Sequence, residues 1–135
     1  MYRYYTLILL FITSVCYADS PVVYQTIALE AGGEPLAGQI AVACVIRQRA
    51  DERGQTFEQV VLSPYQFSCH NGAHRELTAR EIVQAKRAWA QSAAEYKEFD
   101  ANLYCRYNVY PNWRANERVE FRRRIRNHIF FKESI

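Results

Sequence analysis

A Gly-Gly-Glu-Pro break between two apolar runs constrains this chain more than any other feature. The break covers residues 32–35, and helix-compatible apolar residues lie on both sides of it. We expect Gly32 to close the first helix in the left-handed conformation that glycine adopts readily. We expect Pro35 to lie in the first turn of the next helix, where no N–H donor is needed. Two helices, over residues 22–31 and 36–50, should therefore meet at a tight turn.

Glu30 is predicted to lie in the last turn of the first of these helices. A helix C-terminus carries partial negative charge and disfavours a carboxylate, and the neighbours Leu29 and Ala31 are apolar. Both conditions favour the protonated carboxyl group that a general acid needs near neutral pH. Glu30 is therefore the candidate catalytic residue, and the alternative is a solvated acid near a helix end.

Capping boxes and periodicity predict the remaining elements of one compact domain. The boxes pair Thr56 with Gln59 and Thr78 with Glu81. They predict a short helix over residues 57–62 and a long amphipathic helix from residue 79 to about residue 96. Strand formers at 103–110 and 125–131 predict a small antiparallel sheet. The helix over 36–50 is apolar on most sides, so we expect it to be the central one.

Residues 1–18 have the organisation of an export signal. Arg3 supplies the positive end, residues 6–15 the apolar core, and Ala18 the small residue before cleavage. The apolar run is shorter than the roughly 20 residues of a membrane span. We therefore expect a signal peptide over 1–18 and a mature domain over 19–135, exported to the periplasm or beyond, with no membrane association after cleavage; the alternative is that the leader is retained as an uncleaved anchor. The formal charge of +3 is mild, and no nucleic-acid motif occurs.

Export permits disulfide bonds, and three cysteines follow the leader. Cys44 lies in the apolar helix and is interpreted as core, which leaves Cys69 and Cys105 as a candidate pair. A bridge between them would stabilise the fold by about 4 kcal/mol in the chain-entropy model; the alternative is free thiols. His70 and His74 lack a third metal ligand nearby, so no metal or cofactor is expected.

Side chains able to contact a sugar lie in two segments. The loop over 63–77 offers Gln66 and Ser68, and the later aromatic residues include Tyr104 and Trp113. Strand alternation predicts that about half of these aromatic residues point into the core instead. The arginine-rich segment that follows is interpreted as a solvated face, with attraction to an anionic glycan or phospholipid as the alternative.

Five sequence blocks resemble one known family. They are Leu29-Glu-Ala-Gly-Gly-Glu-Pro35, Gly38-Gln-Ile-Ala-Val-Ala43, Val60-Val-Leu-Ser-Pro-Tyr-Gln-Phe-Ser-Cys69, Val109-Tyr-Pro-Asn-Trp113, and Ile125 followed by His128-Ile-Phe-Phe131. In this order they resemble the SleB/CwlJ-type cell wall hydrolase domain over nearly all of the chain after its leader. The chain departs from the family's Thr-His-(Tyr/Phe)-His block, which reads Asn102-Leu-Tyr-Cys105, and has Arg126 where a glycine is common.

The resemblance implies an α+β fold, a helix-rich lysozyme-like domain with a small antiparallel β-sheet. It also implies a lytic transglycosylase that binds peptidoglycan glycan strands and cleaves the β-1,4 bond between N-acetylmuramic acid and N-acetylglucosamine. Separately from the resemblance, we expect a monomer. Glu30 would be the single catalytic acid, with Glu34 and His128 orienting the site. The candidate substrate contacts are Gln39, Gln66, Ser68, Tyr104 and Trp113; the alternative for the first four is to support other site residues without touching substrate.

Two alternatives remain open from the sequence. One is an N-acetylmuramoyl-L-alanine amidase, although such enzymes often use zinc and the chain is poor in metal ligands. The other is a secreted wall-binding module without turnover, which the missing histidines permit. Gln39 has its own alternative as an ordinary exposed helix residue.

Overall fold

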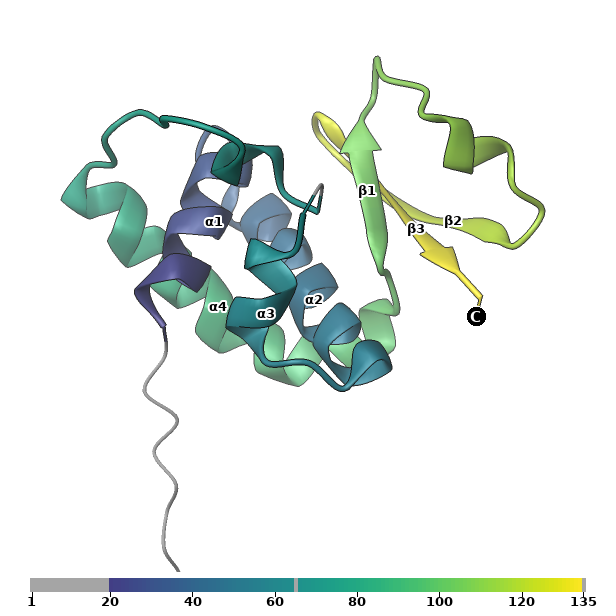
Figure 1. Cartoon of the computed structure of the whole chain (residues 1–135), viewed down its shortest axis with the longest axis horizontal. Helices are drawn as coiled ribbons and strands as arrows, with labels where there is room; N and C mark the ends of the chain where they lie inside the picture. Colours follow the sequence, from purple (N-terminus) through teal and green to yellow (C-terminus); the bar gives the residue numbers. More distant parts are fainter. Residues whose placement is uncertain (1–19, 65, 135) are drawn as a thin grey trace, which may run out of the picture.

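The computed structural model describes residues 20–64 and 66–134. Its helices are α1 (Pro21–Ala31), α2 (Leu36–Arg53), α3 (Phe57–Leu62) and α4 (Ala79–Phe99), with short 3-10 turns η1 (Ser68–His70) and η2 (Asn112–Ala115). Its strands are β1 (Leu103–Arg106), β2 (Val119–Ile125) and β3 (His128–Glu133). The helices form one body and the sheet stands at its side (Figure 1). The predicted signal peptide, residues 1–18, lies outside the described residues.

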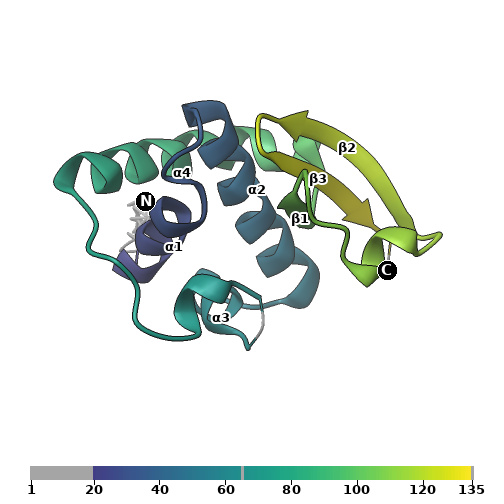
Figure 2. The same ribbon diagram turned by 90° about the horizontal axis from the view of Figure 1, so that it is seen from above.

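Helix α2 is the central element, as the sequence predicts. Ten of its 18 residues are buried, and α1, α3 and α4 all pack against it (Figure 2). The helix runs three residues beyond the expected end and stops at Gly54, whose φ of 59° is the left-handed conformation that glycine tolerates. Its mostly small and apolar side chains allow neighbours to approach on nearly every side.

Both capping boxes are present. The Thr56 and Thr78 hydroxyls accept the backbone N–H of Gln59 and Glu81 at 3.1 and 3.2 Å, respectively. Helix α4 continues three residues past the predicted end, to Phe99. The Phe99 ring meets the Phe130 ring of β3 edge to face at 5.4 Å. The extra turn therefore attaches the helical body to the sheet.

The sheet is antiparallel, in the order β1-β3-β2. Where one closing strand over 125–131 was expected, a turn at Arg126 and Asn127 separates two strands. Strand β2 was not predicted from the sequence. A bulge between Phe121 and Arg123 interrupts the alternation of inward and outward side chains on which strand prediction depends. Arg126 has a φ of 48°, which explains why a glycine suits this position.

The Gly-Gly-Glu-Pro break at residues 32–35 differs from the predicted conformation. Gly32 has φ −62° and ψ −27°, so it is not left-handed as predicted. A glycine is needed there for another reason: a Cβ would lie 2.3 Å from the Ala28 carbonyl oxygen. Pro35 precedes α2 directly as its N-cap. Within residues 20–64 and 66–134, no helix has the length and apolar character needed to span a membrane.

Candidate active site

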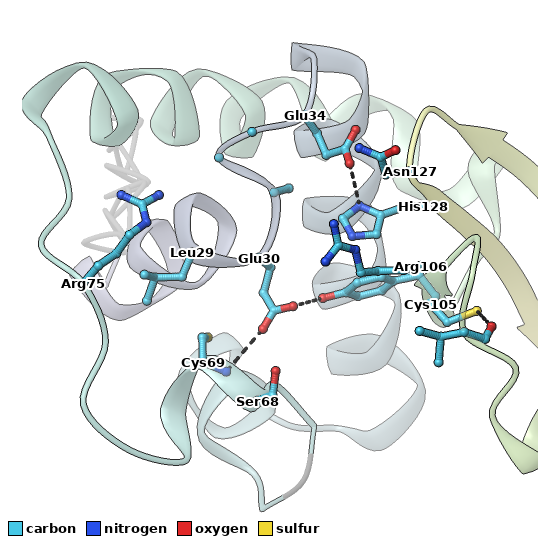
Figure 3. A pocket seen from close by; sticks show the side chains of 15 residues that line it. Leu29, Glu30, Glu34, Ser68, Cys69, Arg75, Cys105, Arg106, Asn127 and His128 are labelled. Atoms are coloured by element: carbon cyan, nitrogen blue, oxygen red, sulfur yellow. Dashed lines mark hydrogen bonds and ion pairs between the residues drawn. The ribbon is translucent and has the colours of Figure 1, made fainter.

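A pocket of about 660 Å³ lies where the end of α1 faces β1 and the start of β3 (Figure 3). Its helical side consists of the last turn of α1, the turn into α2 and part of η1. Five predicted site residues line it: Glu30, Glu34, Ser68, Tyr104 and His128. The pocket thus joins segments that are up to about a hundred residues apart in the sequence.

The Glu30 carboxylate is held from two sides. Its Oε2 accepts a hydrogen bond from the Tyr104 hydroxyl at 2.8 Å, and its Oε1 accepts the Cys69 backbone N–H at 3.4 Å (Figure 3). The side chain is partly buried and still lines the pocket. A partly buried carboxyl group oriented by two donors and open to a cavity has the geometry of a general acid.

Tyr104 lines the pocket, and its hydroxyl is directed to Glu30. Burial and the adjacent Glu30 carboxylate raise the pKa of Tyr104 well above its ordinary value of 10, so the hydroxyl stays a donor to Glu30. The ring is fixed between Phe130, at 5.7 Å, and His128, at 5.3 Å. Tyr104 is thus placed to orient the acid.

The 3-10 turn η1 is tied to α1 by a histidine that the sequence analysis considered only as a metal ligand. The Thr26 hydroxyl lies 2.7 Å from His70 Nε2 and donates to the Val22 carbonyl oxygen at 2.7 Å. Since that proton is used, Nε2 must carry the hydrogen that joins His70 to Thr26. This contact holds the neighbouring Cys69 amide against Glu30.

Arg49 is a buried cation whose charge interacts with Glu30 and Tyr104. Its Nε donates to the Asn102 carbonyl oxygen at 2.7 Å, and its guanidinium lies 5.2 Å from the centre of the Phe67 ring. Burial lowers the pKa of Arg49 to about 10, with electrostatic contributions from Tyr104 and Glu30 in the opposite direction. It therefore remains positive at neutral pH and attracts the Glu30 carboxylate electrostatically. An arginine at helical spacing from the buried residues Val42 and Ile46 was the available signal.

Glu34 and His128 form a second pair in the pocket wall. Glu34 Oε1 lies 3.9 Å from His128 Nδ1, and both side chains are buried (Figure 3). Burial lowers the pKa of His128, and the two glutamates Glu34 and Glu30 oppose that effect. The pair connects the α1–α2 turn to the first residue of β3, which makes it a link between the two halves of the site.

Three predicted substrate contacts lie elsewhere. Gln39 is 2% exposed and donates to the Glu34 carbonyl oxygen at 3.3 Å, so it supports the turn instead of meeting substrate. Gln66 does not line the pocket. Trp113 packs edge to face on Phe131 at 5.4 Å, outside the pocket lining.

The predicted disulfide is not formed, because Cys69 and Cys105 are both free thiols. They lie on opposite sides of the pocket (Figure 3). Cys69 is beside Glu30 in η1, and Cys105 Sγ donates to the Val109 carbonyl oxygen at 3.6 Å. Burial and the Glu30 carboxylate raise the pKa of Cys69 to about 12, so its thiol stays protonated. Across the residues that the structure describes, no three His, Cys, Asp or Glu side chains are grouped to hold a metal ion.

Comparisons with known proteins agree with this architecture. The catalytic domain of the Bacillus cereus SleB protein is 23% identical, with 82% of this chain and 86% of that chain covered and a TM-score of 0.65. The catalytic domain of the germination-specific lytic transglycosylase SleB from Bacillus anthracis is also 23% identical. It covers 87% of this chain and 100% of that chain, with a TM-score of 0.67. These likenesses show the predicted fold.

No curated protein matches the chain. The family described as Cell Wall Hydrolase matches residues 33–131, from the second glycine of the break to the end of the Phe130-Phe131 pair. The matched range contains every pocket residue discussed above except Glu30, which precedes it by three positions. Because the match spans most of the chain, this protein belongs to the cell wall hydrolase family.

Proposed function

We propose that this protein is an exported peptidoglycan lytic transglycosylase with Glu30 as its acid and base. The observation that supports the proposal is the Glu30 carboxylate, held by Tyr104 and Cys69 at the wall of a pocket large enough for sugar rings. The bond cleaved is the β-1,4 link between N-acetylmuramic acid and N-acetylglucosamine. The Bacillus anthracis domain of similar fold is described as that of a lytic transglycosylase.

In the first step Glu30 donates its proton to the glycosidic oxygen while the bond from that oxygen to the muramic C1 breaks. A single carboxyl group suffices where the substrate's own N-acetyl group assists at C1, in place of the second carboxylate that many glycosidases use. Tyr104, the Cys69 amide and the buried Arg49 all favour the carboxylate that this step creates. Donors and positive charge that act on a group as it becomes negative stabilise the transition state in this way.

In the second step the Glu30 carboxylate takes the proton of the muramic C6 hydroxyl, and that oxygen bonds to C1 as the bond between C1 and the assisting N-acetyl oxygen breaks. The product is a 1,6-anhydro ring, and Glu30 regains the proton it donated. Glu34 does not share this role in our proposal because it is buried and directed to His128. Ser68, which is exposed at the pocket, is the proposed substrate contact from the loop.

Removal of a leader after Ala18 and action as a monomer in the periplasm or outside the cell are parts of the same proposal. They rest on the apolar segment at the N-terminus and on the requirement that a wall-cleaving domain reach its polymer. N-terminal sequencing of the protein recovered from the wall would locate the cleavage site.

The decisive experiment is mass spectrometry of peptidoglycan digested with the protein, beside the Glu30→Gln variant. We expect 1,6-anhydro-muropeptides from the wild type alone, with both proteins showing the same thermal unfolding. Reducing-end sugars would instead identify a hydrolase, and released stem peptides an amidase. Activity retained by folded Glu30→Gln would refute the assignment of the acid.

A further inference from the structure

Positive charge is concentrated in the C-terminal part of the chain. Residues 106–126 contain seven arginines and two glutamates, a net charge of +5. The other described residues contain nine lysines and arginines against eleven acids, a net charge of −2. The basic segment includes the end of β1, the connection with η2, and the whole of β2. Attraction for an anionic ligand is therefore local to the sheet.

Part of this charge gathers at the end of the sheet that borders the pocket. The register pairs Arg106 with His128 and Arg124 with Ile129, so the ends of all three strands meet there. Arg126 lies in the turn between β2 and β3. We call Arg106, Arg124 and Arg126 the basic rim. Arg106 lines the pocket, together with Asn127 and His128 from the turn and β3 (Figure 3).

The rim arginines are exposed and arranged to present N–H groups. The Arg124 guanidinium stacks 4.9 Å from the centre of the Tyr107 ring, and its Nε donates to the Arg126 carbonyl oxygen at 3.1 Å. These two contacts restrain the Arg124 side chain, which remains exposed. A fixed planar guanidinium is well suited to paired hydrogen bonds with a carboxylate. By contrast, Arg122 is already paired with Glu120 and Asp100, so it is not included.

We propose that the basic rim binds the carboxylates of the peptide stems on the glycan strand that occupies the pocket. This inference rests on the proposed function. In peptidoglycan the sugars are neutral once the muramic lactyl carboxyl is in amide linkage, and the negative charge lies on the stems. A stem that leaves a muramic residue in the pocket toward the sheet meets Arg106 first and then passes Arg126 and Arg124. The rim thus makes the enzyme selective for strands with free stem carboxylates.

The test compares two substrates that differ in charge but not in length. Uncrosslinked glycan strands with stems are used as isolated, and the same strands are used after their carboxylates are converted to amides with ammonia and a carbodiimide. We expect the wild type to have a KM about five- to tenfold lower for the charged strands at low salt, with similar kcat. The difference should disappear at about 0.5 M NaCl, where screening is nearly complete beyond a few ångströms.

Two variants with equal loss of charge separate the rim from a general charge effect. Arg124→Gln with Arg126→Gly should abolish the preference, and Gly at residue 126 suits the φ of 48° there, which protects the fold. Arg80→Gln with Arg87→Gln removes two exposed charges from α4 and should keep the preference. Equal KM values for both substrates with the wild type, or an unchanged preference in the rim variant, would overturn the proposal.

Failure of the basic-rim proposal can be distinguished from failure of the proposed transglycosylase activity. Binding of both strands to the Glu30→Gln protein, measured by fluorescence anisotropy, requires no cleavage. If that protein prefers charged strands while the wild type gives no anhydro product, the rim proposal stands and the transglycosylase proposal falls. If the rim variant loses sedimentation with phosphatidylglycerol vesicles but keeps its preference between strands, the rim is a membrane surface and the stem proposal is refuted.

Discussion

Replacement of Tyr104 by Phe tests how the site holds its acid. The change removes the hydroxyl that donates to Glu30 Oε2 at 2.8 Å and keeps the ring that packs against Phe130 and His128. A hydrogen bond to a charged acceptor contributes about 1.5–3 kcal/mol. Because Glu30 becomes negative as it donates its proton, most of this free energy is expressed in the transition state.

The expected result is a fall in kcat of about 10- to 150-fold, since each 1.36 kcal/mol is a factor of ten in rate. KM should change little, because in our proposal the hydroxyl is directed to Glu30 and not to substrate. Release of anhydro-muropeptides from soluble glycan strands gives both constants. Circular dichroism and thermal unfolding should show an intact fold.

Tyr110→Phe is the matched control, because Tyr110 is 70% exposed and does not line the pocket. It should retain wild-type kcat. Our reasoning would be refuted if folded Tyr104→Phe kept kcat within about twofold of the wild type. A rise in KM with unchanged kcat would return Tyr104 to the role of a substrate contact.

Three further predictions concern stability. Gly32→Ala should destabilise the fold by about 1–3 kcal/mol, a typical cost of overpacking, because its Cβ would lie 2.3 Å from the Ala28 carbonyl oxygen. Gly33→Ala, whose Cβ meets nothing within 4 Å, should melt much closer to the wild type, and equal melting temperatures for the two would contradict this reasoning. Arg126→Gly should stabilise by up to about 1 kcal/mol, because relief of left-handed strain exceeds the added freedom of the unfolded chain; a lower melting temperature would show that the turn is not strained. Burial lowers the pKa of His128 below its ordinary value of 6.5, so its contribution to stability is present above pH 6.5 and lost as the pH falls through the lower folded value. Urea unfolding at pH 7.5 and pH 5 should show a larger acid loss for the wild type than for His128→Gln, and parallel losses would remove His128 as the cause.

The sequence predicted those parts of the fold that depend on local chemistry. Two capping boxes located the beginnings of α3 and α4, and continuous apolar character identified α2 as the central helix. The end of α1 placed Glu30 beside a tight break. Each of these signals acts within a few residues, where the backbone geometry and the hydrogen-bonding groups are set by the local sequence.

The sequence failed where distant segments compete for the same space. Gly32 is a local exception: it was expected to adopt a left-handed conformation, but a side chain is excluded there because its Cβ would lie 2.3 Å from the Ala28 carbonyl oxygen, four residues earlier. Strand β2 depends on a bulge against β3, which has no local signature. The Cys69–Cys105 pair agreed with export chemistry, yet the fold places the two thiols across a pocket from each other.

The site itself divides in the same way. The local sequence predicted Glu30 as the candidate acid, because it lies in the last turn of a helix among apolar neighbours and before a tight break. The tertiary structure decided what this carboxylate meets: the Tyr104 hydroxyl from a strand 74 residues later and the Cys69 amide, with the positive charge of the buried Arg49 acting on it electrostatically. It also excluded Gln39 and Trp113 from the pocket and brought Arg106 to it. The physical reason is that a hydrogen bond or an ion pair depends on separation in space, whereas the sequence records separation along the chain.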